Sequence, residues 1–296
     1  MTQSIDPSNV AQNYRTIVRN TIKELDYKVN VVGFLTTDFG PSKTYADYTK
    51  FGCEDVGINF ELRKVERLNL ENAILEANRD PEIHGVFVYY PIFENQQDNY
   101  IKDQLNFTKD IEGLSQYWVR KLYSNQRIVN HNNQTFKALL PCTPLAIVKL
   151  LSEAGIYRTD NQEQPLQGKA ITIFNRSEVV GRPLAVMLAN DGAKIYSFDE
   201  HGPQLFEKSK ISEIAIDRAS ALEMSDVVIT GVPNKSFPKI QLSEIKSGAI
   251  CLNFSTIQNF EPDIIEKSSM FIPRVGPVTV AMCMRNALRL YENFHR

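Results

Sequence analysis

The sequence predicts an α/β fold in two domains, each built on a parallel β-sheet. The chain has 296 residues, more than one hydrophobic core usually organises. In both halves, short β-branched or apolar runs alternate with segments of helical periodicity. Between positions 168 and 199, a strand, a glycine-containing turn, a helix and a second strand follow one another.

The first half contains three predicted strands and three predicted helices. The strands are expected near 31–35, 59–65 and 85–89, and the helices at about 8–25, 43–56 and 68–78. The segment 123–137 is polar and rich in turn-forming residues, which predicts a surface loop. After it, Thr143 suits the N-cap and Pro144 the first position of a helix, so Cys142 lies at a helix start.

The second half predicts one parallel sheet over about 145–275. Its strands are expected at 170–174, 193–198, 213–216, 226–229, 249–253 and 270–272, with a helical apolar pattern over 179–188. A last helix, 278–292, is expected to pack back on the first domain. The predicted domains are therefore 1–144 together with 278–296, and 145–277.

The turn after 170–174 is typical of a dinucleotide-binding site of the Rossmann type. Because the first N–H groups of a helix have no internal partner, a pyrophosphate can dock there. Gly181 removes a Cβ where backbone must approach phosphate, and Pro183 suits a first helical turn. Asn175 and Ser177 replace the first two glycines of the usual pattern, so an ordinary strand-to-helix turn remains the alternative. The turn residues expected at the cofactor are Asn175, Arg176, Ser177, Val180, Gly181 and Pro183.

An acidic pair, Asp199-Glu200, follows the next strand about twenty residues past the turn, where an acid binds the adenosine ribose. The alternative is a merely polar strand end. A carboxylate here repels a 2′-phosphate, which predicts NAD rather than NADP, unless Arg176 neutralises Asp199 and offers the phosphate a partner. Further cofactor contacts are expected from Gly231, Val232, Pro233, Asn253 and Phe254.

Composition excludes several functional classes. A formal net charge of −2 gives no electrostatic case for nucleic acid or anionic membrane. The four cysteines are far apart and form no C-x-x-C, which indicates reduced thiols and a cytoplasmic protein. Neither they nor the four histidines have metal-ligand spacing, so no metal is expected. The polar N-terminus predicts no signal peptide, and no apolar run has bilayer length.

The first half carries three unusual segments that suit a substrate site. Ser42 follows a Gly-Pro turn that opens a helix, and Tyr45 and Thr49 share one face of that helix. The strand at 85–89 runs into Pro91 at the carboxyl end of a sheet, where α/β proteins place ligands. Two acids and a lysine precede a glycine over 109–113. Taken singly, these segments also fit a helix cap, a core strand end and a solvated charge run.

Together the segments resemble the methylenetetrahydrofolate dehydrogenase/cyclohydrolase family over nearly the whole chain. Six motifs stand in the family's order: Gly40-Pro41-Ser42-x-x-Tyr45, Gly85-Val-Phe-Val-Tyr89-Tyr-Pro91, Lys109-Asp110-Ile-Glu112-Gly113, Pro141-Cys142-Thr143-Pro144, Asn175-Arg176-Ser177-x-x-Val180-Gly181-x-Pro183 and Val275-Gly276-Pro277-Val-Thr279.

The departures from the family pattern indicate its monofunctional, NAD-dependent branch. Thr49 stands where the family has the lysine that assists the cyclohydrolase step, and Tyr89 where it has glutamine. Lys50 is adjacent, but one helical position turns a side chain by about 100°. Without an amine to manage protons, hydrolysis of a methenyl group should be crippled. Asp199-Glu200 replaces the family's His-Ser/Thr.

The resemblance implies hydride transfer from 5,10-methylenetetrahydrofolate, expected to be polyglutamylated, to NAD. Tyr45 would flank the folate ring, Glu112 would bond pterin nitrogens, and Asp110 would hold their loop. The full expected set is Tyr45, Thr49, Glu112 and Cys142 as catalytic residues, and Ser42, Tyr89, Pro91, Asp110, Pro277 and Thr279 with Tyr45 and Glu112 around the substrate.

The sequence allows more than one interpretation of Cys142 and of the number of activities. A helix start can lower a thiol pKa, but the reaction has no covalent step for Cys142, so a positioning role is favoured. The resemblance implies a homodimer. The alternatives to a monofunctional dehydrogenase are a bifunctional enzyme rescued by Lys50 and a catalytically silent NAD or folate sensor.

Overall fold

A computed structural model describes residues 5–25 and 27–296 and divides the chain into two compact units. The small-sheet unit comprises Ala11–Lys121, Gln126–Cys142 and Thr279–Arg296. The large-sheet unit comprises the described part of Met1–Val10, Leu122–Asn125 and Thr143–Val278. Among the described residues, no helix combines the length and the apolar character needed to cross a membrane.

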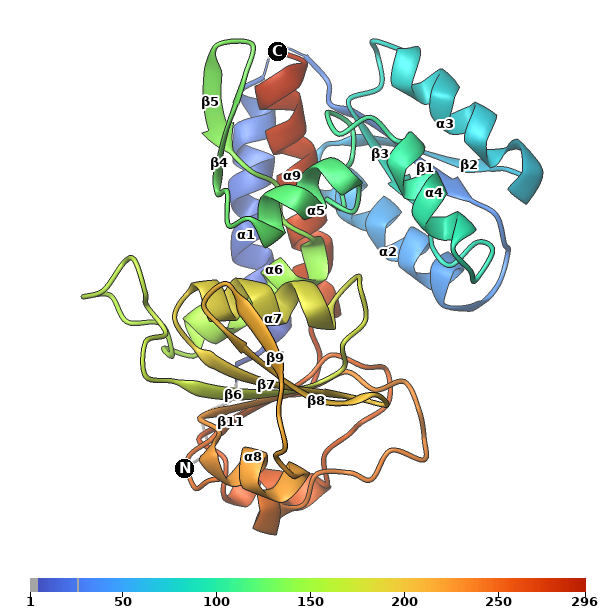
Figure 1. Cartoon of the computed structure of the whole chain (residues 1–296). Coiled ribbons are helices and arrows are strands. Elements are labelled where there is room, and N and C mark those ends of the chain that lie inside the picture. The colour runs from blue at the N-terminus through green and yellow to red at the C-terminus, as the bar shows by residue number, and fades with distance from the viewer. Residues whose placement is uncertain (1–4, 26) are drawn as a thin grey trace. The chain divides into compact units, whose positions relative to one another are not determined.

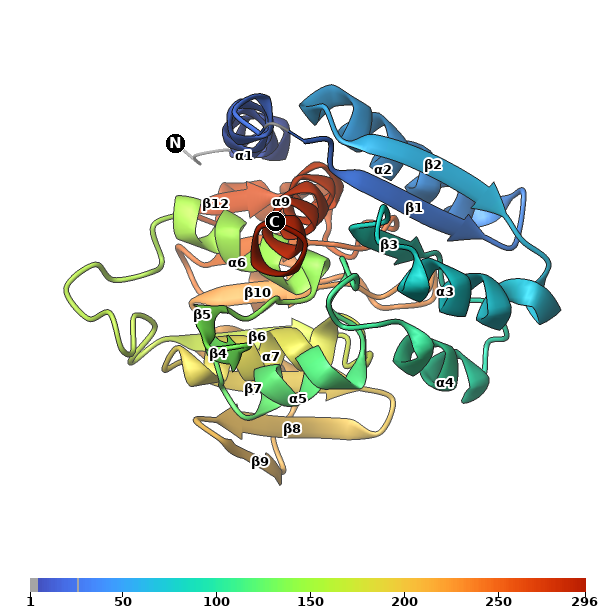
Figure 2. The same cartoon turned by 90° about the horizontal axis from the view of Figure 1, so that it is seen from above.

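The small-sheet unit is built on three parallel strands in the order β2-β1-β3. Figure 2 shows α2 on one face of this sheet and α3 on the other. Alternate residues of β1 face opposite sides, so Val32 and Phe34 join Ile74 of α3 and Ile101 of α4 in one core. The bounds are β1 Asn30–Leu35, α2 Gly40–Val56, β2 Asn59–Lys64, α3 Leu70–Arg79, β3 Gly85–Val88 and α4 Gln97–Gln104.

The loop predicted for 123–137 is wrong, because the structure has an antiparallel hairpin there. Asn132 and Asn133 adopt φ of 48° and 62°, which a two-residue hairpin turn requires and asparagine tolerates. Phe136 and His131 pack on Phe294 of the last helix, with ring centroids 4.8 and 5.6 Å away. The bounds here are α1 Pro7–Lys23, α5 Gln116–Tyr123, β4 Ile128–His131, β5 Gln134–Lys137 and α9 Gly276–Phe294.

The large-sheet unit is built on seven strands in the order β12-β11-β10-β6-β7-β8-β9. Figure 1 shows α7 and α8 on opposite faces of this sheet. The five strands from β12 to β7 are parallel. The bounds are α6 Cys142–Glu153, β6 Ala170–Phe174, α7 Gly181–Asn190, β7 Lys194–Asp199, β8 Gly202–Glu207, β9 Lys210–Glu213, α8 Arg218–Met224, β10 Val227–Thr230, β11 Ile250–Asn253 and β12 Met270–Ile272.

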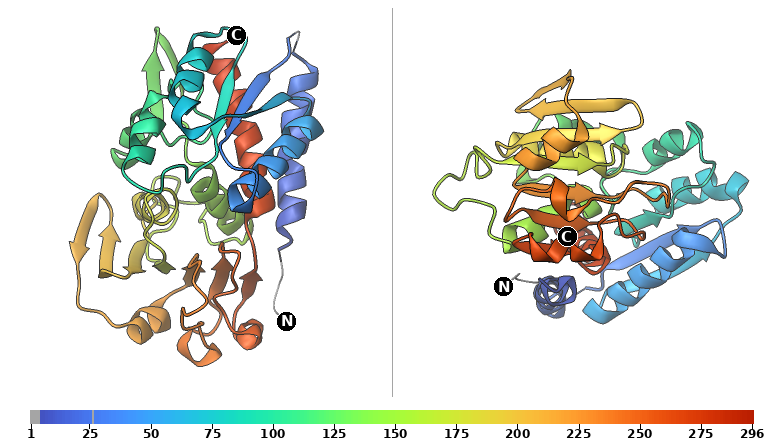
Figure 3. Two further views of the ribbon diagram at one scale, coloured as in Figure 1. Left: turned by 90° about the vertical axis from the view of Figure 1, so that its right-hand side faces the viewer. Right: turned by 90° about the horizontal axis from the view of Figure 1, so that it is seen from below.

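The sheet is mixed rather than wholly parallel, and the strand predicted at 213–216 is wrong. Gly202, the first residue of β8, adopts φ of 99° after a two-residue turn that follows β7, so the chain reverses and forms the antiparallel strands β8 and β9. Figure 3 shows these gold strands at one edge of the sheet. The other predicted strands are confirmed to within a residue or two, as are the helices at 8–25, 68–78 and 278–292; α2 begins three residues before its prediction.

The strand order places a crevice at the carboxyl ends of the central strands. The chain passes from β6 to β7 on one side, and later to β10 on the other side of β6. The connections therefore leave the carboxyl edge in opposite directions, and ligands of open α/β sheets bind at such a switch point.

Candidate active site

A pocket of about 910 Å³ opens at this switch point in the large-sheet unit. Its lining comes from the ends of β6 and β7, from the segments that follow β6, β7 and β10, and from Arg182 of α7, Gln204 of β8 and Arg218 of α8. The predicted residues in it are Asn175, Arg176, Ser177, Asp199, Glu200, Val232 and Pro233. Of the other predicted cofactor residues, the lining does not include Val180, Gly181, Pro183, Gly231, Asn253 and Phe254.

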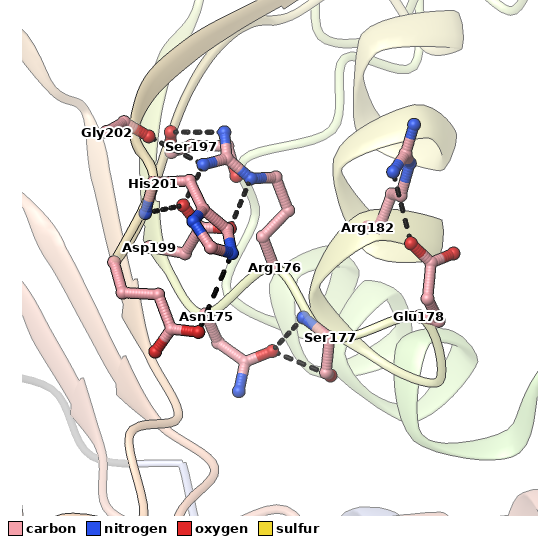
Figure 4. A network of polar contacts seen from close by, with 10 residues as sticks. Asn175, Arg176, Ser177, Glu178, Arg182, Ser197, Asp199, His201 and Gly202 are labelled. Carbon is pink, nitrogen blue, oxygen red and sulfur yellow. Dashed lines mark hydrogen bonds and ion pairs between the residues drawn. The ribbon is translucent and has the colours of Figure 1, made fainter. Parts of the chain in front are cut away.

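Asn175 stands at a glycine position of the usual pattern, and its side chain forms hydrogen bonds that hold its backbone in a strained conformation. Its φ is 149°, a region that favours glycine. The side-chain amide donates to the Gly231 carbonyl at 2.9 Å, and its oxygen accepts from the Ser177 N–H at 2.9 Å and hydroxyl at 2.8 Å. Figure 4 shows Asn175 facing Ser177 across the turn. These bonds offset backbone strain of about 1–3 kcal/mol.

Gly181 is required for packing, and its predicted role in phosphate approach stays a prediction. A Cβ at this position would lie 2.0 Å from the Asn175 carbonyl oxygen, so only glycine lets α7 begin so close to β6. The Ser177 hydroxyl also accepts from the Val180 and Gly181 N–H groups at 3.3 and 3.4 Å. The helix start is therefore weakly capped by its own chain, and a phosphate must share or displace the Ser177 hydroxyl.

Arg176 is paired with Asp199. The guanidinium donates to both carboxylate oxygens, from Nε to Oδ2 at 2.8 Å, and also to the carbonyls of Gly202 at 2.6 Å and Ser197 at 3.4 Å. Only 4% of the Arg176 side chain is exposed, and Figure 4 shows its guanidinium among these three residues. Burial alone would raise the pKa of Asp199, but hydrogen bonds from Arg176 and the His201 N–H lower it below its ordinary value.

The far wall of the pocket is aromatic and cationic, and no sequence motif marks it. The Arg218 guanidinium lies 5.5 Å from the Phe174 ring centroid and 5.4 Å from that of Phe237, while it pairs with Glu244 at 2.9 Å. Phe198 stacks on Phe174 with ring centroids 5.1 Å apart. Flat apolar faces next to an acid that accepts hydroxyls suit an adenosine, so the residues present fit a dinucleotide.

A second polar cluster lies in the small-sheet unit around Tyr45. Its hydroxyl donates to Glu112 Oε1 at 3.2 Å and lies 3.2 Å from the Cys283 sulfur of α9. Burial, reinforced by the nearby Asp110 carboxylate, raises the pKa of Glu112 to about 8. Glu112 is therefore mostly protonated at neutral pH in this state and can both donate and accept a hydrogen bond.

Thr49 and Tyr89 form a buried hydrogen-bonded pair. Their hydroxyls lie 2.5 Å apart, and the Thr49 oxygen also approaches the carbonyls of Tyr45 and Ala46 at 3.1 and 3.0 Å. Thr49 is 0% and Tyr89 1% exposed. By contrast, Lys50 is exposed and lies 3.9 Å from Glu54. The tyrosine hydroxyl thus fills the space beside residue 49, and Lys50 does not point into it.

The charged run at 109–113 is not a solvated surface segment, because Lys109 and Asp110 are buried. Asp110 accepts the N–H groups of Gly113 at 2.9 Å and Ser115 at 2.7 Å, so it holds the loop that carries Glu112. The Lys109 ammonium donates to the Ala77 and Asp80 carbonyls at 2.8 and 2.5 Å, which caps the end of α3.

The other predicted substrate residues lie on three elements. The Ser42 hydroxyl of α2 donates to the Tyr90 carbonyl at 3.1 Å, directly before Pro91 and its cis peptide bond. Pro277 and Thr279 lie in the first turns of α9.

Cys142 is a buried thiol rather than an activated one. Its sulfur donates to the Ile111 carbonyl at 3.5 Å, and burial, together with the neighbouring Cys283 thiol, raises its pKa well above the ordinary range. The helix α6 begins at Cys142 itself, not after it. Within 5–25 and 27–296, no three histidine, cysteine or acidic side chains gather as metal ligands would.

Comparisons with known proteins identify the family of the chain. The tetrahydrofolate dehydrogenase/cyclohydrolase catalytic-domain model matches residues 5–112, and the NAD(P)-binding-domain model of that family matches 141–295. A methylenetetrahydrofolate dehydrogenase [NAD(+)] of Dictyostelium discoideum is 43% identical, covering 98% of this chain and 94% of that protein. A bifunctional protein FolD of Nitrosopumilus maritimus is 26% identical, covering 96% and 94%.

The fold is also that of a solved relative. The structure of the NAD-dependent 5,10-methylenetetrahydrofolate dehydrogenase from Saccharomyces cerevisiae matches with a TM-score of 0.90 at 38% identity, covering 99% of this chain and 98% of that one.

Proposed function

The chain belongs to the tetrahydrofolate dehydrogenase/cyclohydrolase family, and we propose that it is an NAD-dependent 5,10-methylenetetrahydrofolate dehydrogenase without cyclohydrolase activity. Its similarity to relatives that carry the NAD-dependent name exceeds its similarity to a bifunctional one, at 43% against 26% identity. The observation that carries the proposal is the Arg176–Asp199 pair in the dinucleotide pocket.

This pair favours NAD over NADP by geometry as well as charge. Arg176 does neutralise Asp199, which is the condition under which the sequence left NADP open. However, its guanidinium is engaged by the Asp199 carboxylate and by the Gly202 and Ser197 carbonyls, so it does not present a free fork to a 2′-phosphate, and the carboxylate stands where that phosphate would bind. A carboxylate has about four acceptor positions. The two Arg176 bonds and the His201 N–H, at 2.8 Å, occupy three of them, so one remains for a ribose hydroxyl.

Bound NAD supplies a hydride acceptor at C4 of its nicotinamide. The C–H bond of the one-carbon bridge breaks with its electron pair, and the resulting cation is delocalised over the two folate nitrogens, so no carbon-bound proton needs a base. The protein's task is to orient the substrate and exclude water. Tyr45 presents a ring and Glu112 a hydrogen-bonding carboxyl, and Asp110 holds the loop that aims Glu112.

The Thr49–Tyr89 pair supports the loss of cyclohydrolase activity. Hydrolysis of a methenyl group needs a base that activates water and a group that returns a proton. The position where the family has lysine holds a neutral hydroxyl bonded to another neutral hydroxyl, and burial raises the pKa of Tyr89 further from neutrality. Lys50 is turned to solvent beside Glu54 and cannot substitute.

A spectrophotometric assay tests the proposal. The purified chain is given methylenetetrahydrofolate with NAD or NADP, and both NADH and the methenyl product are followed. We expect turnover with NAD, and methenyl that decays only at its uncatalysed rate. Faster decay would show a bifunctional enzyme, and ligand binding without turnover would show a sensor.

We further propose a homodimer that forms through the edge of the large sheet. All four residues of β9 are exposed, Ile211 is 43% exposed, and no described strand pairs with the outer side of β9. A second copy of β9 would satisfy these backbone groups. Light scattering on the wild type and on Ile211→Lys, which should weaken the dimer, tests this.

Two proposals concern substrate form and cellular place. We propose that the substrate is polyglutamylated, which the family resemblance supports; two lysines of α2 that could contact a polyglutamate tail, Lys43 and Lys50, already pair with Asp47 and Glu54. A comparison of KM for mono- and pentaglutamyl substrates tests this. A cytoplasmic location is supported by four unpaired cysteine thiols and is tested by cell fractionation.

A further inference from the structure

Asn286 of α9 is a fully buried amide in the small-sheet unit. It lies where the loop that carries Glu112 meets the segment that leads into Cys142, a contact called the seam below. Its Nδ2 donates to the Ile111 carbonyl at 2.9 Å and to the Leu140 carbonyl at 3.1 Å, and lies 3.4 Å from the Cys142 sulfur. The two amide hydrogens match the two carbonyls. One side chain therefore joins the residue before Glu112 to the segment that leads into Cys142.

The seam itself is tight. A Cβ on Gly113 would lie 3.3 Å from the Leu140 backbone carbon, so the Glu112 loop lies directly against the segment before Cys142. The Asn286 amide donates to a backbone carbonyl on each side of this seam, that of Ile111 and that of Leu140. Without the amide, the Leu140 carbonyl loses this donor and the Ile111 carbonyl keeps only the weak Cys142 thiol at 3.5 Å, so removal of the amide should let the two segments separate and admit water.

The side chain of Glu112 is fixed from the opposite direction. Tyr45 donates to it at 3.2 Å and also contacts Cys283, which lies one turn before Asn286 on α9 and within reach of the Cys142 thiol. Glu112 is thus held at its carboxyl by Tyr45 and through its preceding peptide by Asn286. The Asn286 Oδ1 has no hydrogen-bond partner among the described residues, so the amide contributes hydrogen bonds only through its N–H donors.

We propose that Asn286 is a positioning residue that sets the placement of Glu112 relative to Cys142, and thereby the fit of the folate substrate. This inference rests on the proposed function for the identity of that substrate. Asn286 itself does not touch the reacting atoms. Its role is to hold two chain segments in register, and a positional error near 1 Å at such a site lowers rates by about 100-fold.

Three variants separate positioning from packing. Asn286→Asp keeps the shape but offers at most one O–H donor in place of two N–H donors, and Asn286→Leu keeps a similar volume without polar atoms. Leu290→Ala is the control, because Leu290 is also fully buried on α9 but makes no polar contact. We expect both Asn286 variants to lower kcat/KM for methylenetetrahydrofolate by about 10- to 100-fold with KM for NAD unchanged, and Leu290→Ala to lower only the melting temperature.

A second readout does not depend on turnover. The labelling rate of Cys142 by a maleimide, resolved by mass spectrometry, should rise in both Asn286 variants while NAD binding by calorimetry stays as in the wild type. Wild-type labelling and kinetics in a folded Asn286→Asp variant, or equal effects of Leu290→Ala, would overturn the proposal. If the wild type itself shows no turnover, the proposed function fails, and the labelling comparison still decides the role of Asn286.

Discussion

The cofactor preference of this chain should depend on Asp199, and the structure specifies what its removal changes. In Asp199→Ser, Arg176 loses two charge-assisted hydrogen bonds and keeps its contacts with the Gly202 and Ser197 carbonyls. A guanidinium that is 4% exposed then needs an anion. The 2′-phosphate of NADP offers one at the place where the carboxylate stood.

The magnitude follows from the contacts that are lost and gained. NAD loses one hydrogen bond from a ribose hydroxyl to a charged acceptor, about 1.5–3 kcal/mol, or roughly 10- to 100-fold in kcat/KM. NADP is freed from repulsion and gains a bond to Arg176 of similar strength, so the ratio of the two cofactors should move by about 100-fold or more. The unpaired arginine should also lower the free energy of unfolding by about 3 kcal/mol.

Glu200→Ser is the matched control. It removes the same charge from the adjacent residue, whose side chain is 86% exposed and is not bonded to Arg176. Initial rates with each cofactor, at fixed folate, measure the preference in both variants. If Asp199→Ser stays folded and still ignores NADP, or if Glu200→Ser shifts the preference equally, the pairing does not determine the choice.

Three other outcomes are expected. Tyr89→Phe breaks the bond to Thr49 and should lower the free energy of unfolding in urea by about 1 kcal/mol; Tyr117→Phe, at a partly exposed ring, is a control that should change less. Lys109→Met removes the ammonium donor from the Ala77 carbonyl of α3 and leaves the Asp80 carbonyl only the Ile83 N–H, so it should lower the free energy of unfolding by about 1–3 kcal/mol, whereas Lys64→Met, at an exposed lysine, should have little effect. Because the folded-state pKa of Glu112, about 8, exceeds its ordinary 4.5, its contribution to stability is complete below about pH 4.5 and is lost as the pH rises through 8; Glu112→Gln should remove this slope from urea titrations, and an unchanged slope would contradict the assignment.

Most regular elements could be predicted because their signals are local. The buried runs that became β6 and β12 have the predicted bounds. The hairpin at 128–137 was missed because its strands are polar and are stabilised by Phe294, which is distant in the sequence. The β8–β9 hairpin was missed because its direction depends on the turn at Gly202 rather than on periodicity.

Some residues of the candidate site could be predicted from local sequence, and others could not. Motif spacing selects Asn175, Asp199 and Tyr45, because a turn or a helix face is set by neighbouring residues. Nothing in the spacing selects Arg218 or Asn286, because each acts on segments far along the chain. Sequence reasoning selected Gly181 for phosphate approach, and only the structure shows that its packing against Asn175 also requires a glycine.

By itself, the sequence determined the fold class, the turn that marks a dinucleotide site, and the substitutions at Thr49, Tyr89 and Asp199. Only the tertiary structure decided what those substitutions do. Thr49 bonds to Tyr89, and Asp199 engages Arg176. Hydrogen bonds and ion pairs form over about 3 Å between groups with defined directions, so their partners depend on the folded positions of distant residues.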